Sequence, residues 1–132
     1  MATIFTEIVA GRTPCFKILE DDEFLAFLSE TPMRGGHSLV IPKNEVDAIF
    51  EMDEGALSRM MLFAKRAAQL IQSAVPCVKI GLMAAGIQVR HAHLHLVPID
   101  QPSDLDFSKQ KPAAVEDLKK MADAILKKNF SR

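Results

Sequence analysis

Three of the four histidines in the chain occupy every second position of the stretch RHAHLHLVP (90–98), as His91, His93 and His95. On a helix, side chains two residues apart point about 200° away from each other, whereas on a strand they lie on the same side. The residues between these histidines are alanine and leucine, which suit the buried side of a sheet. We therefore predict a strand over residues 89–97 with an apolar back and an imidazole front.

A row of imidazoles on one face has two chemical uses. Neighbouring imidazoles disfavour one another's charged form, and the neutral imidazole is the form that attacks an electrophile or binds a metal. Alternate histidines on a strand can ligate zinc. Alternatively, one imidazole can act as a covalent nucleophile while its neighbours position it or the transferred group. A purely structural role suits one buried histidine better than three on one face, and the spacing alone leaves both chemical uses open.

The rest of the chain supplies the elements that must position this strand. Gly35-Gly36 and Pro42 bound a second strand, and Asp53 stands where the N-cap of a long helix belongs, with Pro76 near its end. In chain order we expect a short helix at 4–10, strands at 15–20, 23–29 and 37–42, a helix from Asp53 to about Pro76, strands at 77–83 and 89–97, and a helix over about 113–130. Five strands joined mostly by short turns indicate an α+β fold with an antiparallel sheet.

Composition narrows the class of protein. A chain of 132 residues fits a single domain, which we expect to span 1–132. The net charge of −1 and the lack of a basic stripe argue against a nucleic-acid polymer as partner. No apolar run approaches the ~20 residues of a membrane span, so we expect no membrane partner. Cys15 and Cys77 form no Cys-x-x-Cys pair, which favours reduced thiols in a cytoplasmic protein.

Two longer motifs resemble a known family. GGHSLVIPK (35–43), followed by AAGIQVRHAHLHLVP (84–98), resembles the histidine triad (HIT) family of nucleotidyl hydrolases and transferases. The stretches TIF and VAGRTPCFKILEDDEFLAF extend the resemblance, which covers about residues 3–98. It implies a homodimer in which the helix over 53–75 and the strand from Cys77 meet their symmetry mates. It also implies a nucleotide substrate, and we expect no cofactor and no metal.

The resemblance also implies a role for each of the four histidines. His93 would attack the α-phosphorus of a nucleoside phosphoramidate, a dinucleoside polyphosphate or a related nucleotide ester, giving a nucleotidyl-histidine that water hydrolyses. His95 would contact the phosphate and assist the leaving group. His91 and His37 would extend the imidazole cluster and orient the nucleophile.

The same resemblance implies a set of nucleotide contacts, which are Phe27, Ser29, Gly86, Gln88, His93 and His95. Glycine at position 86 would let the backbone approach the phosphate. Gln88 stands where family members often have a small hydroxyl residue, and Ile87 stands where they commonly have glutamine. The usual donor to the phosphate is therefore missing or has moved to Gln88.

Other positions depart from the family pattern near the expected nucleoside. Ser29 and Glu30 stand where an aspartate for the ribose hydroxyls and an apolar residue for the base are frequent. Ile80 replaces a frequent polar residue near the sugar and phosphate. Thr3 and Thr6 replace a common Cys-x-x-Cys half of a zinc site. The sequence therefore keeps three hypotheses open: a nucleotidyl hydrolase or transferase, a zinc protein, and a nucleotide-binding or scaffold protein with weak catalysis.

Overall fold

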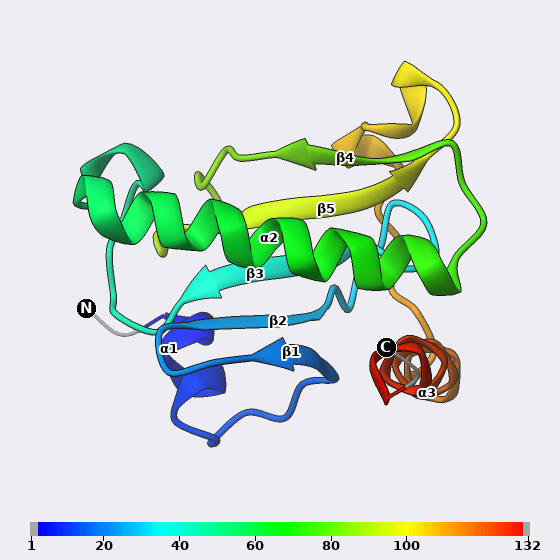
Figure 1. The fold of residues 1–132 in the computed structure, drawn as a ribbon, viewed down its shortest axis with the longest axis horizontal. Helices are drawn as coiled ribbons and strands as arrows, with labels where there is room; N and C mark the ends of the chain where they lie inside the picture. Colours follow the sequence, from blue (N-terminus) through cyan, green and yellow to red (C-terminus); the bar gives the residue numbers. More distant parts are fainter. Residues whose placement is uncertain (1–2, 131–132) are drawn as a thin grey trace.

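A single antiparallel sheet organises the chain (Figure 1). The computed structural model describes residues 3–130, so the ends of the expected domain, 1–2 and 131–132, lie outside the described residues. The five strands follow the order β1-β2-β3-β5-β4, and every neighbouring pair is antiparallel. They are β1 (Lys17–Glu20), β2 (Phe24–Leu28), β3 (Ser38–Pro42), β4 (Lys79–Met83) and β5 (Leu94–Ile99). The predicted α+β class and the five strands are confirmed.

Three helices accompany the sheet, and they are α1 (Ile4–Val9), α2 (Glu54–Ala74) and α3 (Val115–Phe130). The predicted N-cap of α2 is confirmed, because the Asp53 carboxylate accepts a hydrogen bond from the Ala56 N–H at 3.0 Å. Short 3₁₀ turns occur at η1 (Ile49–Glu51), η2 (Pro102–Asp104) and η3 (Phe107–Lys109). None of the helices in the described part of the chain is long and apolar enough to cross a membrane.

The two faces of the sheet are covered differently. Helix α2 lies across the front of the sheet in Figure 1, with α3 beside it, and α1 lies behind. Alternate residues of β2 divide accordingly, since Ala26 packs in the larger apolar core with α2 and α3, whereas Phe27 packs in a smaller cluster with α1. We refer to these as the α2 face and the α1 face. This division decides on which side of the sheet each histidine lies.

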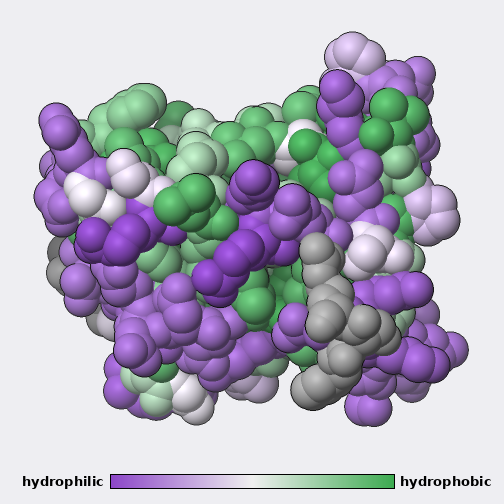
Figure 2. All heavy atoms as spheres, viewed as in Figure 1, coloured by the Kyte–Doolittle hydropathy of each residue, from purple (hydrophilic) through white to green (hydrophobic). Residues whose placement is uncertain are grey.

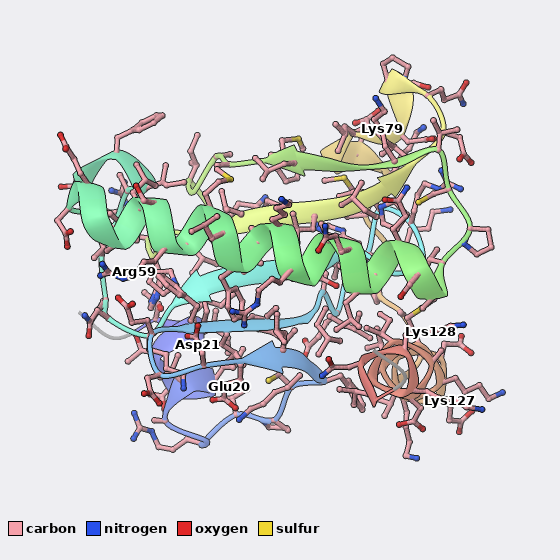
Figure 3. All side chains as sticks on the ribbon, in the orientation of Figure 1. Glu20, Asp21, Arg59, Lys79, Lys127 and Lys128 are labelled. Atoms are coloured by element: carbon pink, nitrogen blue, oxygen red, sulfur yellow. The ribbon has the colours of Figure 1, made fainter. Side chains whose placement is uncertain are left out.

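Charged residues lie at the rim. Asp21, in the turn between β1 and β2, accepts hydrogen bonds from the backbone N–H groups of Glu23 and Phe24 at 2.9 and 2.8 Å. Arg59 of α2 pairs with Glu23, with its Nη2 2.9 Å from a carboxylate oxygen. Figure 3 shows Asp21 and Arg59 at the same end of the molecule. The ion pair therefore ties α2 to the β1–β2 turn.

The strand that carries the histidines is shorter than predicted. We expected it over 89–97, but β5 begins at Leu94, so that start is wrong. The register with β3 pairs Val40 with Leu94, and its continuation would place Pro42 opposite Ala92. Proline has no N–H to donate to a strand ladder, and the Ala92 N–H instead bonds to the Val46 carbonyl at 2.6 Å. His91 and His93 therefore lie in a loop that leads into β5.

Candidate active site

The four histidines gather on the α1 face of the sheet, and we call His37, His91, His93 and His95 the histidine cluster. On β5, Leu94 and Leu96 enter the core under α2, so His95 between them points to the opposite side. The ring centroids of His93 and His95 are 5.0 Å apart, and those of His37 and His95 are 5.2 Å apart. The predicted apolar back and imidazole front are thus confirmed at β5, and His37 joins the cluster from the residue just before β3.

His37 is placed by the glycines that precede it. Gly36 adopts φ +94°, a left-handed conformation that glycine reaches without strain, and a Cβ there would lie 3.0 Å from a methyl group of Val75. The chain then enters β3 with the imidazole of His37 fully buried. Its backbone carbonyl accepts a hydrogen bond from the Ser29 N–H at 2.9 Å, which fixes the end of β2 beside it.

His91 joins the loop before β5 to the rest of the fold. Its Nε2 atom lies 2.8 Å from the Pro42 carbonyl oxygen, and since a carbonyl only accepts, Nε2 is the donor. Its Nδ1 atom lies 3.4 Å from the Thr3 hydroxyl at the start of α1. The ring is fully buried and lies edge-on to Phe5. His91 therefore holds its own backbone, including its carbonyl oxygen, in a fixed place.

That carbonyl determines the tautomer of His93. The Nδ1 atom of His93 lies 2.7 Å from the His91 carbonyl oxygen, so Nδ1 must carry the proton. In the neutral ring the lone pair then belongs to Nε2. Phe5 of α1 packs edge-on against this ring, with the centroids 5.0 Å apart. The loop before β5 thus leaves Nε2 of neutral His93 without a proton.

A second chain of hydrogen bonds determines the tautomer of His95. The Met33 backbone N–H donates to Nδ1 of His37 at 2.9 Å, so the proton of neutral His37 is on Nε2. This Nε2 lies 3.0 Å from Nδ1 of His95 and donates to it. Neutral His95 must then carry its own proton on Nε2. Beside the lone pair of His93, the cluster therefore presents an N–H donor from His95.

Burial keeps these rings neutral. Desolvation, and secondarily the neighbouring His95, lowers the pKa of His37 to about 3. Desolvation, and secondarily His93, lowers the pKa of His95 to about 4. The pKa of His93 is also lowered, mainly by burial, although its hydrogen bond to the His91 carbonyl acts in the opposite direction. All three rings are neutral at pH 7, which is the form that a nucleophile and an uncharged donor require.

Two phenylalanines that the residue pattern did not single out border the cluster. Phe5 packs against His93 as described, and Phe107 of η3 packs edge-on against His95, with centroids 5.2 Å apart. Phe5 lies within TIF, which contributed only to the family resemblance. Phe107 follows the part of the chain that the resemblance covers, and no local motif marks it. Only 7% of His93 and of His95 remains exposed.

The expected nucleotide contacts on β2 and directly after it, Phe27 and Ser29, lie on the α1 face. Phe27 packs against Phe5 with ring centroids 5.8 Å apart. In the sheet, Phe27 is paired with Leu39 of β3, and Leu39 is paired with His95 of β5, so the three side chains lie in one row. Ser29 is buried, and its hydroxyl accepts the Thr31 backbone N–H at 3.2 Å. The structure therefore brings Phe27 and Ser29 to the same side of the sheet as the histidine cluster.

The expected contacts in the loop after β4 are less close. Gly86 adopts φ +73°, and a Cβ there would meet nothing within 4 Å, so backbone conformation explains this glycine. Gln88 and Ile87 are exposed. Between residues 3 and 130, no hydrogen bond joins Gln88 or Gly86 to an imidazole. Ile80 packs on the α2 face, so it does not border the histidine cluster within this chain.

The donor geometry does not resemble a zinc site. Within the described residues, no three histidine, cysteine, aspartate or glutamate side chains are grouped so that they could hold a metal ion. One ring nitrogen of His91 is bonded to Pro42, one of His93 to the His91 carbonyl, and one of His95 to His37. Each of these bonds engages one of the two nitrogens of a ring, so at most one nitrogen of each ring remains for a metal ion.

The fold and the site together define a class: small α+β proteins with a cluster of buried imidazoles on one face of a five-stranded antiparallel sheet. A protein-family model described as the HIT domain matches residues 10–102 of this chain. The chain belongs to the HIT domain family.

Known proteins agree with this membership. The adenylylsulfatase HINT3 of Arabidopsis thaliana is 31% identical over 100 residues, which cover 72% of this chain and 51% of that protein. A hypothetical histidine triad nucleotide-binding protein of Sulfolobus tokodaii has the same fold, with a TM-score of 0.85 at 24% identity over 97% of this chain and 92% of that one. A zinc-bound histidine triad family protein of Mycobacterium smegmatis gives a TM-score of 0.79 at 25% identity over 100% and 99% of the two chains.

Proposed function

We propose that this protein is a nucleotidyl hydrolase or transferase in which Nε2 of His93 attacks the α-phosphorus of a nucleotide substrate. The observation that carries the proposal is the 2.7 Å hydrogen bond from His93 Nδ1 to the His91 carbonyl, which leaves the lone pair on Nε2. The similarity to an adenylylsulfatase, over about half of that protein, supports a reaction at a nucleotide phosphate. Candidate substrates are nucleoside phosphoramidates and dinucleoside polyphosphates.

The proposed reaction has two steps. In the first, a bond forms between His93 Nε2 and the α-phosphorus, while the bond to the leaving group breaks and its electron pair goes to the leaving atom. An amine leaving group takes up one proton from solvent. In the second, water attacks the nucleotidyl-histidine, the nucleoside monophosphate departs, neutral His93 is restored and one proton returns to solvent. The net reaction consumes one water.

The neighbouring groups stabilise this chemistry. The modified ring of His93 is cationic, and its Nδ1–H remains bonded to the His91 carbonyl, which favours that charge. The Nε2–H of His95 donates to a phosphate oxygen or to the leaving atom. His37 acts as a positioning residue, because its own Nε2–H holds the acceptor side of His95. A donor fixed before the reaction stabilises developing charge without reorganisation cost.

The nucleoside is proposed to lie toward α1, with the apolar surface around Phe27 on one side and Ser29 near the sugar. Gly86 and Gln88 would contact the phosphate after a movement of the loop that carries them. Ser29 offers a neutral hydroxyl instead of a carboxylate, which weakens its hold on ribose. The nucleoside pocket is accordingly less selective than the phosphate site.

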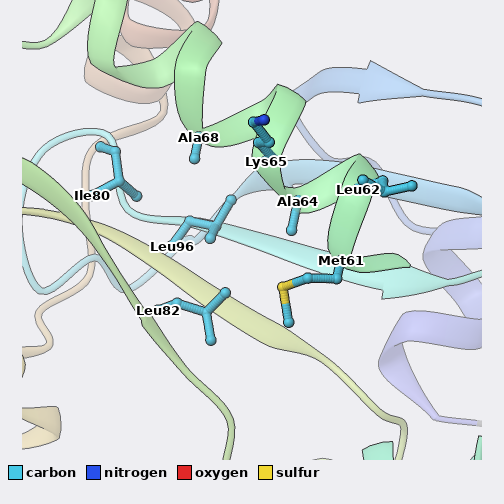
Figure 4. Close-up of a pocket in the computed structure, with 8 residues that line it drawn as sticks. All are labelled: Met61, Leu62, Ala64, Lys65, Ala68, Ile80, Leu82 and Leu96. Atoms are coloured by element: carbon cyan, nitrogen blue, oxygen red, sulfur yellow. The ribbon is translucent and has the colours of Figure 1, made fainter. Parts of the chain in front are cut away.

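We also propose a homodimer. Hydrophobic residues gather over α2 and β4 on the face seen in Figure 2. There an apolar groove lies between α2 and the edge strand β4 (Figure 4), with Leu62 and Leu82 largely exposed. Its lining is Met61, Leu62, Ala64, Lys65, Ala68, Ile80, Leu82 and Leu96. An unpaired apolar edge strand is an aggregation hazard unless it is covered, and a symmetry mate would cover both the groove and the edge.

A nucleotide panel followed by intact-mass measurement tests the catalytic proposal. The parent protein, incubated briefly with adenosine and guanosine phosphoramidates and dinucleoside polyphosphates, should gain the mass of one nucleotidyl group. His93→Ala should gain none, and the control Lys119→Ala, on the exposed side of α3, should behave as the parent does. Binding without an adduct or turnover would instead support a nucleotide-binding or scaffold protein, and zinc that copurifies in a stoichiometric amount would support the metal hypothesis.

A further inference from the structure

The segment between β5 and α3 places one aromatic ring against the histidine cluster. This segment, yellow to orange in Figure 1, contains η2 and η3. Phe107 lies at the start of η3, and its ring is inclined by 82° to that of His95 at a centroid distance of 5.2 Å. Yet 39% of Phe107 is exposed. The ring thus contacts the cluster on one side and offers free apolar surface on the other.

The position of Phe107 is held by several independent contacts. The Asp106 carboxylate accepts the Ser108 N–H and hydroxyl, at 2.9 and 2.7 Å, and so fixes the first turn of η3. The Lys109 ammonium donates to the Ser103 carbonyl at 2.7 Å, which joins η3 to η2.

Before Phe107 in the sequence, Leu105 packs the segment against β4. Leu105 packs so closely on this strand that a Cβ at Gly81 would lie 3.0 Å from its Cδ1 atom. Phe107, as the first residue of an anchored turn, therefore forms a fixed wall beside His95.

Of the two lysines in this segment, Lys109 is held near a carboxylate, and Lys111 lies beyond η3. The Arg34 guanidinium pairs with the Asp104 carboxylate at 2.9 Å, and the Lys109 ammonium lies 3.8 Å from the same carboxylate. Asp106 adds a further carboxylate next to Phe107 in sequence. A leaving group with a polyphosphate chain would bring several negative charges to an apolar ring and to the Asp106 carboxylate, whose hydrogen-bond partner is the uncharged Ser108.

In the proposed reaction, the leaving group departs beside His95. The other ring neighbours of His95 are His37, which holds its Nδ1 side, and His93, which carries the attacking nitrogen. Phe107 is the third ring in contact with it and the only one of the three that is substantially exposed. We infer that Phe107 determines leaving-group specificity, by packing against a planar apolar leaving group and disfavouring a polyphosphate. This inference rests on the proposed function.

The test uses adenosine 5′-phosphoramidates that differ only in the amine, either ammonia or phenethylamine. Both give the same adenylyl-histidine, so the hydrolysis step is common and kcat/KM reports on steps up to amine release. Phe107→Ala should lower kcat/KM for the phenethylamine substrate about three- to tenfold and change the ammonia substrate less than about twofold. The intrinsic reactivity of each amide substrate is the same with every variant. The informative quantity is therefore the ratio of the two kcat/KM values, and how it changes from the parent to each variant.

Two further variants complete the design. Phe107→Leu keeps apolar surface without a planar ring, so its selectivity should lie between those of the parent and Phe107→Ala, and it remains informative if the alanine variant is unstable. Phe50→Ala is the matched control, because Phe50 is 90% exposed on another 3₁₀ turn and should change neither substrate. Equal losses on both substrates, or an unchanged ratio, would overturn the inference alone. Absence of turnover of either substrate by the parent would overturn the proposed function, and the inference with it.

Discussion

The Nδ1 atom of His93 lies 2.7 Å from the carbonyl oxygen of His91, two residues earlier in the same loop. The spacing of the motif thus has a second consequence besides placing imidazoles near one another. It lets the backbone carbonyl of His91 determine which ring nitrogen of His93 carries the proton. His91 is itself held by the Pro42 carbonyl, so the acceptor for His93 is anchored to β3. The free nitrogen of His93 is a consequence of this chain of contacts.

Replacement of His93 by alanine or glycine should abolish turnover. Removal of a covalent nucleophile typically lowers kcat by roughly 10⁴-fold or more. Steady-state hydrolysis of a nucleoside phosphoramidate by the parent and both variants checks this, with circular dichroism as the control for folding. Unchanged rates in a folded variant would rule out the covalent mechanism.

Acid should destabilise the fold before the carboxylates titrate. The pKa values of His37 and His95, about 3 and 4, are lower than the ordinary histidine value of about 6.5. Well above pH 6.5 these rings are neutral in both states and contribute no pH dependence. As the pH falls from about 6.5 to 5, the unfolded chain takes up protons that the native state does not, so stability is lost by up to about 1.4 kcal/mol per pH unit for each histidine.

Urea unfolding measured across that pH window checks the prediction. The carboxylates with lowered pKa, which are Glu20, Asp104 and Asp106, lose stabilisation mainly below this window, so they do not obscure the effect of the histidines. His37→Gln should show a shallower dependence on pH than the parent, because one of the buried rings is gone. A parent whose stability is constant between pH 6.5 and 5 would contradict the neutral assignment.

The parent should be a dimer at micromolar concentration. Leu62→Glu and Leu82→Glu each place a charge in the groove between α2 and β4, where a partner would have to desolvate it, and should give monomers. Val115→Glu, at an exposed apolar position of α3, is the control and should leave the dimer intact. Light scattering measures all four proteins. A monomeric parent would exclude the proposed assembly.

The nucleoside pocket should be weak and should respond to a carboxylate. Ser29→Asp should bind AMP about tenfold more tightly than the parent, since a charged acceptor contributes about 1.5–3 kcal/mol to a hydrogen bond against about 1 for a neutral one. The parent should distinguish poorly between ribose and deoxyribose nucleotides. Calorimetric titration of AMP tests this, with Ser29→Asn as the uncharged control of similar shape. Low-micromolar binding by the parent, without a gain in Ser29→Asp, would show that this description of the pocket is mistaken.

The local pattern of apolar and polar residues was sufficient to predict the helices and strands. It also predicted that the histidines of the triad lie on the side of the sheet opposite to the leucines. Alternation placed His95 opposite Leu94 and Leu96, and a single aspartate before an amphipathic run located the start of α2 at Asp53. These features depend on residues close together in sequence, so the sequence determines them directly. The two motifs around His37 and the triad were also specific enough to indicate the family.

The tertiary structure decided which nitrogens carry protons and what surrounds them. The strand starts late because Pro42, some fifty residues earlier in the chain, lacks the N–H that a partner would need. The tautomer of His95 depends on Met33 through His37, and its apolar wall is Phe107 from beyond the matched region. Hydrogen bonds and ring contacts between distant segments cannot be predicted from the spacing of residues in the sequence. Their geometry exists only after the sheet has brought those segments together.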